Sequence, residues 1–554
     1  MKLRYINLLQ FLIVIFIVAG FYLPVFLFIS GDNPLLTEKS FFEFSLFYNF
    51  FDDYWNLKVI LFTVFQAFLS ALLSIFFGLP GAWLLIKYNF PGKNCFRIIT
   101  FLPFILPSIL VVLAMIQFFG NNGWINRLLI YFFDLEEPPI KFLYSLSGIL
   151  IAHVFYNFPI AMKILADQWE RISMKYSHSA KSIGIGSIKL FFCITLPLIM
   201  PSLGSAFILI FLLCMNSFSI ILVLGGGIEY TTIEVLIYQL ARIELDYSGA
   251  SILALIQCAL SLICITIIIL DRKNNIEQSH SNKSNLIIEL RNYCPKAWFG
   301  FFWICVVLIF VLGPLFTIVL DSFRKFENGE WVYSIYWYKK IFEQRENNFF
   351  LFALWNSFRI GLGSAFLSSF LGLGLVSLIF YKKGATRRFW EIFSFSPIAL
   401  STIIFGIAWY SLFQNNLAGF VPLIYVVIAM HGILTCPYWI RVVLPSLESI
   451  PVQWRIETKM LGKNSFQYGL KILWPWLSKT FLIAFLFSFS LSLGELNSVL
   501  MIADESIHTL PLEIYNAIIG YRFPYASVVS VILLFLTIST YLLFELGFKY
   551  YKLS

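Results

Sequence analysis

Long apolar runs alternate with short polar loops along the whole chain of 554 residues. Each run continues for about 20 residues, the length that an α-helix needs to cross a bilayer, whereas the strands of a membrane β-barrel alternate over about 10 residues. The pattern predicts an all-α polytopic membrane protein with about twelve transmembrane helices. The predicted spans are residues 8–29, 57–86, 98–119, 142–165, 195–223, 250–270, 298–320, 352–380, 392–413, 420–444, 480–502 and 526–547.

Composition excludes the soluble and disordered classes. Hydrophobic residues make up 59% of the chain and charged residues 12%, with a mean hydropathy of +0.83. Soluble domains have roughly 45–50% apolar and roughly 25% charged residues. The eight cysteines form no CxxC pair, so neither a disulfide framework nor a metal site is predicted.

Charge in the loops predicts the orientation. Most of the 39 Lys and Arg residues lie in loops that share one side of the membrane if the N-terminus is cytoplasmic. The loops at 30–56, 120–141, 224–249 and 503–525 are acidic or neutral. Because basic loops stay in the cytoplasm, both termini are predicted there, and the net charge of +9 is attributed to orientation and not to nucleic-acid binding.

The chain repeats itself. A polar stretch at 271–297 separates a first repeat of six spans, 1–270, from a second repeat, 298–554. Equivalent residues recur in register, among them Ser70 and Ser364, Gly78 and Gly372, Pro103 and Pro397, His153 and His431, Glu170 and Glu448, Thr232 and Thr509, and Tyr238 and Tyr515. An even number of spans per repeat makes the two repeats parallel, related by an axis along the membrane normal, and places the expected substrate path between them.

Each repeat has a long cytoplasmic loop between its fourth and fifth spans, at about 163–197 and 441–475. The loops contain HSAKSIGIGSIKLFFCITLP (178–197) and IETKMLGKNSFQYGLKILWP (456–475), with Gly, Ile and Pro at the same spacing. An amphipathic segment precedes each Gly, which permits a sharp bend, and each Pro suits the start of the next span. A helix-turn-helix is therefore expected on the cytoplasmic face of the membrane, where a partner protein can bind it.

This spacing resembles the EAA loop of ABC importer permeases, although the E-A-A triplet itself is degraded to Ala180 in one loop and Glu457 in the other. The resemblance implies that each loop holds a coupling helix, which docks on one of two copies of a separate cytoplasmic ATPase near Gly184 and Gly462. The residues that the resemblance assigns to coupling are Ala180, Gly184, Ile194, Pro197, Glu457, Gly462, Ile472 and Pro475.

ATP hydrolysis is assigned to the partner subunit. The sequence has no G-x-x-x-x-G-K-[ST] motif, because Gly92-Lys93 and Gly462-Lys463 lack both the upstream Gly and the following Ser or Thr. The chain is therefore expected to be a permease and not an enzyme, with no catalytic residue and no cofactor of its own. ATP and Mg²⁺ are expected on the partner ATPase.

Several stretches resemble the ferric-iron and thiamine branch of fused permeases: 152–159 (AHVFYNFP), 224–227 (LGGG), 231–239 (TTIEVLIYQ), 493–495 (LGE) and 509–511 (TLP). The resemblance implies import across a bacterial cytoplasmic (inner) membrane, with a periplasmic or surface-tethered binding protein that selects the substrate. Ferric iron is the leading expectation, with thiamine or another small solute as the alternatives.

Burying a polar residue inside a membrane span costs free energy, and such residues are usually functional. They are therefore candidates for the substrate path. They are His153, Asn157, Asn216, His431, Glu495 and Asn497. Interhelical hydrogen bonding is the alternative role for each. The symmetric His153 and His431 could in principle ligate iron, but no metal site is predicted for them. Glu495 is expected to line the mouth of a cavity.

Two other classes remain as alternatives. A secondary transporter driven by an ion gradient also has two parallel six-span halves. It typically has its long loop between the halves and an Asp/Arg-rich loop after the second span, whereas 87–97 contains no acidic residue. A membrane enzyme or scaffold would need paired intramembrane carboxylates or a His cluster, and the sequence shows neither.

Overall fold

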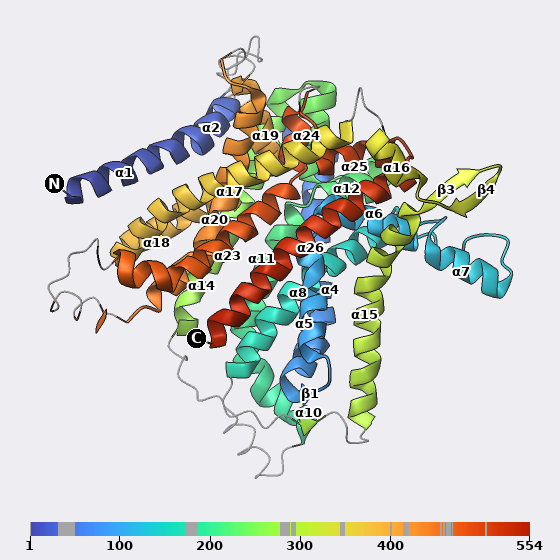
Figure 1. The fold of residues 1–554 in the computed structure, drawn as a ribbon, viewed down its shortest axis with the longest axis horizontal. Helices are drawn as coiled ribbons and strands as arrows, with labels where there is room; N and C mark the ends of the chain where they lie inside the picture. Colours follow the sequence, from blue (N-terminus) through green and yellow to red (C-terminus); the bar gives the residue numbers. More distant parts are fainter. Residues whose placement is uncertain are drawn as a thin grey trace. The chain divides into compact units, whose positions relative to one another are not determined.

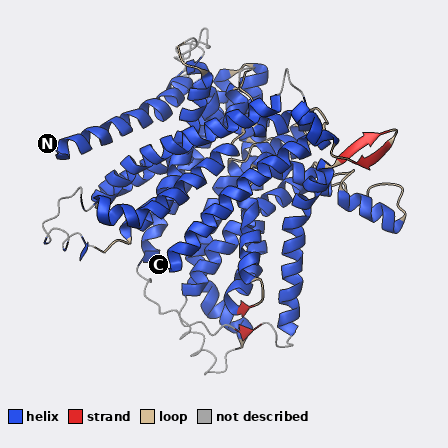
Figure 2. Cartoon of the chain, viewed as in Figure 1, coloured by secondary structure: helices blue, strands red, loops and turns tan. Residues whose placement is uncertain are grey.

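Helices form almost the whole of the computed structural model, with two short pairs of strands (Figures 1 and 2). The structure describes residues 2–30, 50–171, 186–276, 288–289, 295–343, 349–398, 401–413, 420–451, 453–454, 457, 460, 467, 469–504 and 507–553. Within these residues, eleven helices are long and apolar enough to cross a membrane, or twelve if the bent pair Gly384–Ile398 and Thr402–Leu412 is one span. The predicted all-α polytopic class with about twelve spans is confirmed.

The described residues group into two compact units. One unit comprises Phe51–Leu236 and Ala259–Arg324 and is called here the early unit. Its elements are α4 (Tyr54–Lys87), α5 (Lys93–Ile105), α6 (Ser108–Phe119), α7 (Trp124–Phe133), α8 (Leu146–Arg171), α10 (Ser187–Leu190), η2 (Phe191–Thr195), α11 (Leu196–Met215), α12 (Ser219–Leu224), η3 (Ile228–Tyr230), most of α13 (Ile233–Tyr238), α15 (Pro295–Ser322), and the parallel strands β1 (Tyr88–Asn89) and β2 (Ile288–Glu289).

The other unit comprises Met1–Phe50, Ile237–Cys258 and Lys325–Ser554 and is called the late unit. It holds α1 (Lys2–Ile17), η1 (Val18–Tyr22), α2 (Leu23–Ser30), η4 (Gln239–Glu244), the start of α14 (Tyr247–Ile276), most of β3 (Arg324–Glu327), β4 (Glu330–Tyr333), α16 (Tyr336–Glu343), α17 (Phe349–Tyr381), α18 (Gly384–Phe395), η5 (Ser396–Ile398), α19 (Thr402–Leu412), α20 (Leu423–Glu448), η7 (Gly469–Leu473), α23 (Trp474–Leu493), α24 (Asn497–Ile502), α25 (Leu510–Ile519) and α26 (Phe523–Leu553).

The first helix of each sequence half packs in the unit formed mainly by the other half. In the late unit, Gln10 Nε2 donates to Ser377 Oγ of α17 at 2.8 Å, and Trp409 Nε1 of α19 donates to the Gly20 carbonyl at 2.8 Å. In the early unit, α15 packs on α4, with the Phe77 ring centroid 4.9 Å from that of Trp303. The two compact units therefore do not coincide with the two predicted repeats, 1–270 and 298–554. The repeat boundaries describe the sequence and stay a prediction.

Four predicted spans are broken helices. The spans predicted at 98–119 and 392–413 divide between α5 and α6, and between α18 and α19. Leu106 is extended (φ −69°, ψ 144°) because it precedes Pro107, whose ring disfavours a helical neighbour. The spans predicted at 195–223 and 480–502 divide after Met215 and after Leu493. Hydropathy missed these breaks because the residues on both sides are apolar.

Equivalent contacts recur in the two repeats. In the early unit, the Thr63 hydroxyl of α4 accepts a hydrogen bond from the Ile233 amide at 2.9 Å, at the start of α13. In the late unit, the Ser357 hydroxyl of α17 accepts from the Leu510 amide at 2.8 Å, at the start of α25. These residues occupy matching positions in the sequence repeat. Each bond satisfies one helix amide that would otherwise lack a partner.

The equivalent glycines Gly78 and Gly372 lie where the second and fourth spans of each repeat pack closely. A Cβ at Gly78 would lie 3.0 Å from the Met162 amide nitrogen and 3.1 Å from the Phe158 carbonyl oxygen of α8. A Cβ at Gly372 would lie 2.3 Å from Cε3 of Trp439 in α20. Small residues let helix backbones approach closely in membranes, which explains both glycines.

We expect Gly78→Ala to destabilise the purified chain, since the added methyl meets backbone atoms of α8 that cannot rotate away. Overpacking of this kind costs about 1–3 kcal/mol. Thermal unfolding in detergent should show a lower Tm. Gly204→Ala in α11 is the matched control, because nothing lies within 4 Å of its Cβ position. Equal Tm values for the two variants would contradict the close packing of α4 on α8.

Candidate functional site

A buried histidine forms the centre of a polar cluster in the late unit. His431, on α20, is 2% exposed. Its Nδ1 lies 2.8 Å from the Ser492 hydroxyl near the end of α23, and its Nε2 lies 3.3 Å from the Ser498 hydroxyl at the start of α24. Both ring nitrogens are thus paired with hydroxyl groups, on either side of the break between α23 and α24.

Glu495 lies inside that break, half-buried between the two helices. Its Oε1 accepts a hydrogen bond from the Ser498 amide at 3.3 Å, and the hydroxyls of Thr402 and Ser498 also bond to the carboxylate. Asn497 Nδ2 donates to Thr402 Oγ1 at 3.1 Å. These donors are all neutral, so they hold the carboxylate in place without cancelling its charge.

The late unit therefore joins three of the predicted pathway residues into one network. His431 on α20 is far in the sequence from Glu495 and Asn497, which lie together at the break before α24, and Ser498 links the imidazole to the carboxylate. Sequence reasoning missed the connecting hydroxyls of Thr402, Ser492 and Ser498. Serine and threonine are common in apolar spans, so no sequence signal separates these three from the rest.

The equivalent histidine of the early unit has a different environment. His153, on α8, is 1% exposed, and its Nδ1 lies 2.9 Å from the Ser70 hydroxyl of α4. Asn157 Nδ2 donates to the His153 carbonyl at 3.0 Å and contacts Cys214 Sγ at 3.3 Å. Gln66 Nε2 donates to the Cys214 carbonyl at 3.1 Å. The structure thus brings His153 and Asn157 together at the end of α11.

Asn216 lies at the break that follows α11, the counterpart of the break at Gly494. Its backbone is bent (φ −91°, ψ 15°), close to that of Gly494 (φ −92°, ψ −5°). The Ser261 hydroxyl lies 3.4 Å from Asn216 Oδ1. Where the late unit has Glu495, the equivalent residue here is Ser217. The two sites share a helix break and a histidine, and only the site in the late unit has an acidic residue.

The predicted coupling residues are only partly described. Ala180, Gly184 and Gly462 lie outside the described residues. Ile194 is half-buried in the π-helix η2, and Ile472 occupies the equivalent π-helix η7. Pro197 and Pro475 are exposed in the first turns of α11 and α23, and Glu457 is exposed. Their role in coupling stays a prediction.

Charged pairs lie where the fourth span of each repeat ends, next to these loops. In the late unit, Arg387 of α18 forms ion pairs with Glu391 and with Glu448 at the end of α20. The residues at the equivalent positions in the early unit are Lys93 and Glu170. Burial and the neighbouring Arg97 lower the pKa of Lys93, while Glu170 acts in the opposite direction. The same charge arrangement therefore recurs at both helix ends.

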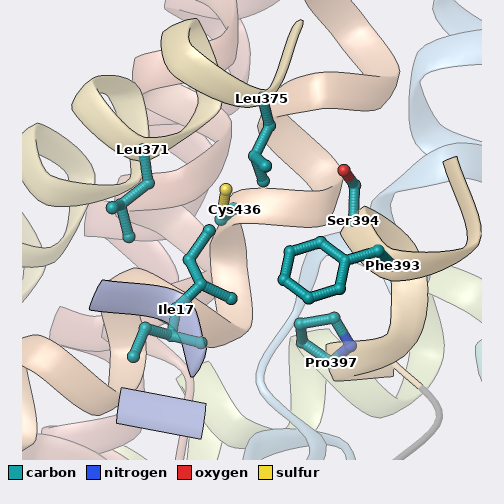
Figure 3. A pocket seen from close by; sticks show the side chains of 8 residues that line it. Ile17, Leu371, Leu375, Phe393, Ser394, Pro397 and Cys436 are labelled. Carbon is teal, nitrogen blue, oxygen red and sulfur yellow. The ribbon is translucent and has the colours of Figure 1, made fainter. Parts of the chain in front are cut away.

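A small apolar cavity lies elsewhere in the late unit, between α1, α17, α18, η5 and α20. Figure 3 shows its lining, in which Ile17, Leu371, Leu375 and Phe393 surround Cys436. Its volume of about 10 Å³ is far below the roughly 300–1,000 Å³ of small-molecule sites. Among the described residues, no group of three or more His, Cys, Asp or Glu side chains could hold a metal ion.

Comparisons with known proteins agree with this architecture. Residues 70–273 match the family model described as "Binding-protein-dependent transport system inner membrane component". The thiamine transport system permease protein ThiP of Brucella abortus (strain 2308) is 29% identical over 482 residues, covering 85% of this chain and 84% of the relative. The proteins of the same name from Haemophilus influenzae and Escherichia coli are 28% and 25% identical, covering 88% and 86% of this chain and equal shares of the relatives.

A solved bacterial ABC transporter involved in the import of the acidic polysaccharide alginate is also similar, with 16% identity and a TM-score of 0.41. The match covers 50% of this chain and 96% of that chain. The relatives span both sequence repeats, and the family model matches the first repeat. Residues 70–273 therefore match the family of binding-protein-dependent inner membrane components, and the chain as a whole is similar, over both repeats, to permeases of ABC importers that carry two permease repeats in one polypeptide.

Proposed function

We propose that this permease imports thiamine. The observation that carries the proposal is the similarity, over most of the length of both chains, to relatives named as thiamine transport permeases. These relatives favour thiamine over ferric iron, which led the expectation from sequence. Iron transport has no support among them.

The chemistry of the late unit supports the same substrate. Thiamine carries a permanent positive charge on its thiazolium ring, and Glu495 offers one carboxylate whose bonded donors are all neutral. Ferric iron prefers several hard oxygen ligands at once. We assign Glu495, with His431 and Asn497 beside it, to the substrate path, and His153, Asn157 and Asn216 to the corresponding position in the first repeat.

Transport is proposed to run by alternating access, driven through the loops at 163–197 and 441–475. Two copies of a cytoplasmic ATPase dock near Gly184 and Gly462, and ATP with Mg²⁺ binds to those subunits and not to this chain. The ion pairs of Arg387 support this mechanism, because they fix the end of α20 that leads into the second loop. A movement of the loop then moves the span attached to it.

The remaining assignments follow from the same proposal. The chain lies in a bacterial inner membrane with both termini in the cytoplasm, and a periplasmic or surface-tethered binding protein delivers the substrate from outside. An ion-gradient-driven secondary transporter is the competing class, and the similarity to permeases of binding-protein-dependent transport systems disfavours it.

Substrate and energy source can be tested together in liposomes that contain this chain and its ATPase. We expect ATP hydrolysis and uptake to rise when the binding protein is loaded with thiamine, and not when it is empty or loaded with ferric iron. Stimulation by the iron-loaded form instead would contradict the assignment of thiamine as the substrate. Uptake that follows an imposed ion gradient without ATP would contradict the proposal that ATP hydrolysis drives transport.

Docking can be tested with Gly184→Pro combined with Gly462→Pro. A proline at either bend removes an amide hydrogen and restricts the preceding residue, so the coupling helix should no longer fit its partner. We expect normal membrane insertion with loss of ATPase co-purification and of transport. Gly204→Ala is a control that leaves the loops unchanged. Retained co-purification of the ATPase would remove the docking assignment.

The assignment of Glu495 to the substrate path can be tested with Glu495→Gln, which keeps the shape of the side chain and removes its negative charge. We expect thiamine uptake to fall at least tenfold while the complex with the ATPase assembles normally, because a cation loses its one carboxylate partner. Glu136→Gln, at an exposed loop position, is the matched control. Uptake by Glu495→Gln equal to that of the control would exclude Glu495 from the path.

A further inference from the structure

Three buried polar atoms of the early unit lack a hydrogen-bond partner within the part of the chain that the structure describes. They are Oε1 of Gln66 on α4, and Nε2 of His153 and Oδ1 of Asn157 on α8. Their side chains are almost fully enclosed, since the three residues are 0%, 1% and 2% exposed. Burying a polar group costs free energy unless a partner bonds to it, so three such atoms on neighbouring helices point to a ligand.

Cys214, near the end of α11, brings the two amide side chains together. Gln66 Nε2 donates to the Cys214 carbonyl at 3.1 Å. Asn157 Nδ2 contacts Cys214 Sγ at 3.3 Å and donates to the His153 carbonyl at 3.0 Å. A carbonyl oxygen accepts only from the NH₂ end of an amide, which fixes the orientation of both side chains. The unpaired atom of each amide is therefore a carbonyl oxygen, an acceptor, and both acceptors lie beside Cys214.

The unpaired imidazole nitrogen has a cause in the sequence. In the late unit, His431 Nε2 lies 3.3 Å from the Ser498 hydroxyl. The first repeat has Ile220 at the position of Ser498, and an isoleucine side chain can neither donate nor accept. His153 Nε2 therefore keeps a hydrogen-bonding capacity that its counterpart in the second repeat has already used.

The two free carbonyl oxygens are also particular to the first repeat. Ile360 occupies the position of Gln66, and Thr435 occupies that of Asn157. Ile360 has no polar atom in its side chain, and the Thr435 hydroxyl donates to the His431 carbonyl at 2.8 Å. The two repeats thus differ in the same direction at three positions, each time with unused hydrogen-bonding capacity in the early unit.

The chemistry of these atoms defines the group that would bind them. Two carbonyl acceptors side by side suit an uncharged amino group, which offers two N–H donors. The imidazole nitrogen donates or accepts according to its tautomer, so it can pair with a nitrogen of the ring that carries the amino group. Thiamine has such a ring, an aminopyrimidine, in addition to its charged thiazolium.

We propose that Gln66, His153 and Asn157 form a subsite that recognises the aminopyrimidine ring of the cargo, whose amino group donates to the two amide carbonyls. The proposal rests on the proposed function and adds a determinant of specificity to it. Glu495 serves the positive charge of the cargo, and the first repeat serves its neutral ring. The subsite is buried in the described state, so cargo reaches it when the helices around Cys214 separate during the transport cycle.

Oxythiamine tests the subsite, because it keeps the thiazolium charge and has an oxo group in place of the amino group. Initial uptake is measured in the liposomes described above, with the same binding protein saturated with thiamine or with oxythiamine. We expect Gln66→Leu and Asn157→Leu each to lower the preference for thiamine over oxythiamine by about three- to tenfold, because each removes one acceptor for the amino group.

Thr63→Val, on the same helix as Gln66, is the control for structural damage. It removes the buried hydroxyl that accepts from the Ile233 amide and leaves the three residues of the subsite unchanged. We expect it to lower uptake of both compounds equally. A preference in Gln66→Leu and Asn157→Leu equal to that of the wild type would overturn the subsite and leave the two amides a structural role. A wild type that takes up neither compound would overturn the proposed function, and the subsite with it.

Discussion

Every backbone amide and carbonyl inside a bilayer must find its partner within the protein, and this constraint shapes the structure. Unbroken helices meet it by themselves. Where a span is interrupted, after Met215 and after Leu493, side chains must bond to the freed groups or cover them. Glu495 meets this need by accepting the Ser498 amide, and the hydroxyls around His431 complete the network. The helix breaks thus concentrate polar groups inside otherwise apolar spans.

The same arrangement occurs twice, with one informative difference. Both repeats break the fifth span, carry a buried histidine on the fourth, and tie a short helix to a hydroxyl of the second span. The second repeat adds the charge of Glu495 where the first has Ser217. Two fused repeats can diverge in this way, whereas two identical subunits cannot. A single carboxylate at this break suits the cargo proposed above, which carries a single positive charge.

Sequence was sufficient for the features that depend on hydropathy and on repetition. The number of spans, the helical class and the equivalence of Tyr238 with Tyr515 all follow from it. It did not predict the helix breaks at Asn216 and Gly494, because the apolar helices on both sides of each break keep the average hydropathy of the span high. It also did not predict that the first helix of each half packs in the other unit, as Trp409 and Gly20 do, because neighbours in sequence are usually expected to pack together. Sequence also did not predict the hydroxyl groups that bond to His431, because serine is common in apolar spans and nothing in the sequence distinguishes Ser492 and Ser498 from the other serines.

The central claim is that each repeat acts as one half of a permease, with its own docking site for an ATPase. The most direct measurement is the stoichiometry of the purified complex by native mass spectrometry. A mass equal to one copy of this chain with two copies of the ATPase is the expected result. A complex with a single ATPase copy, or two copies of this chain around one ATPase pair, would contradict the claim that both repeats couple.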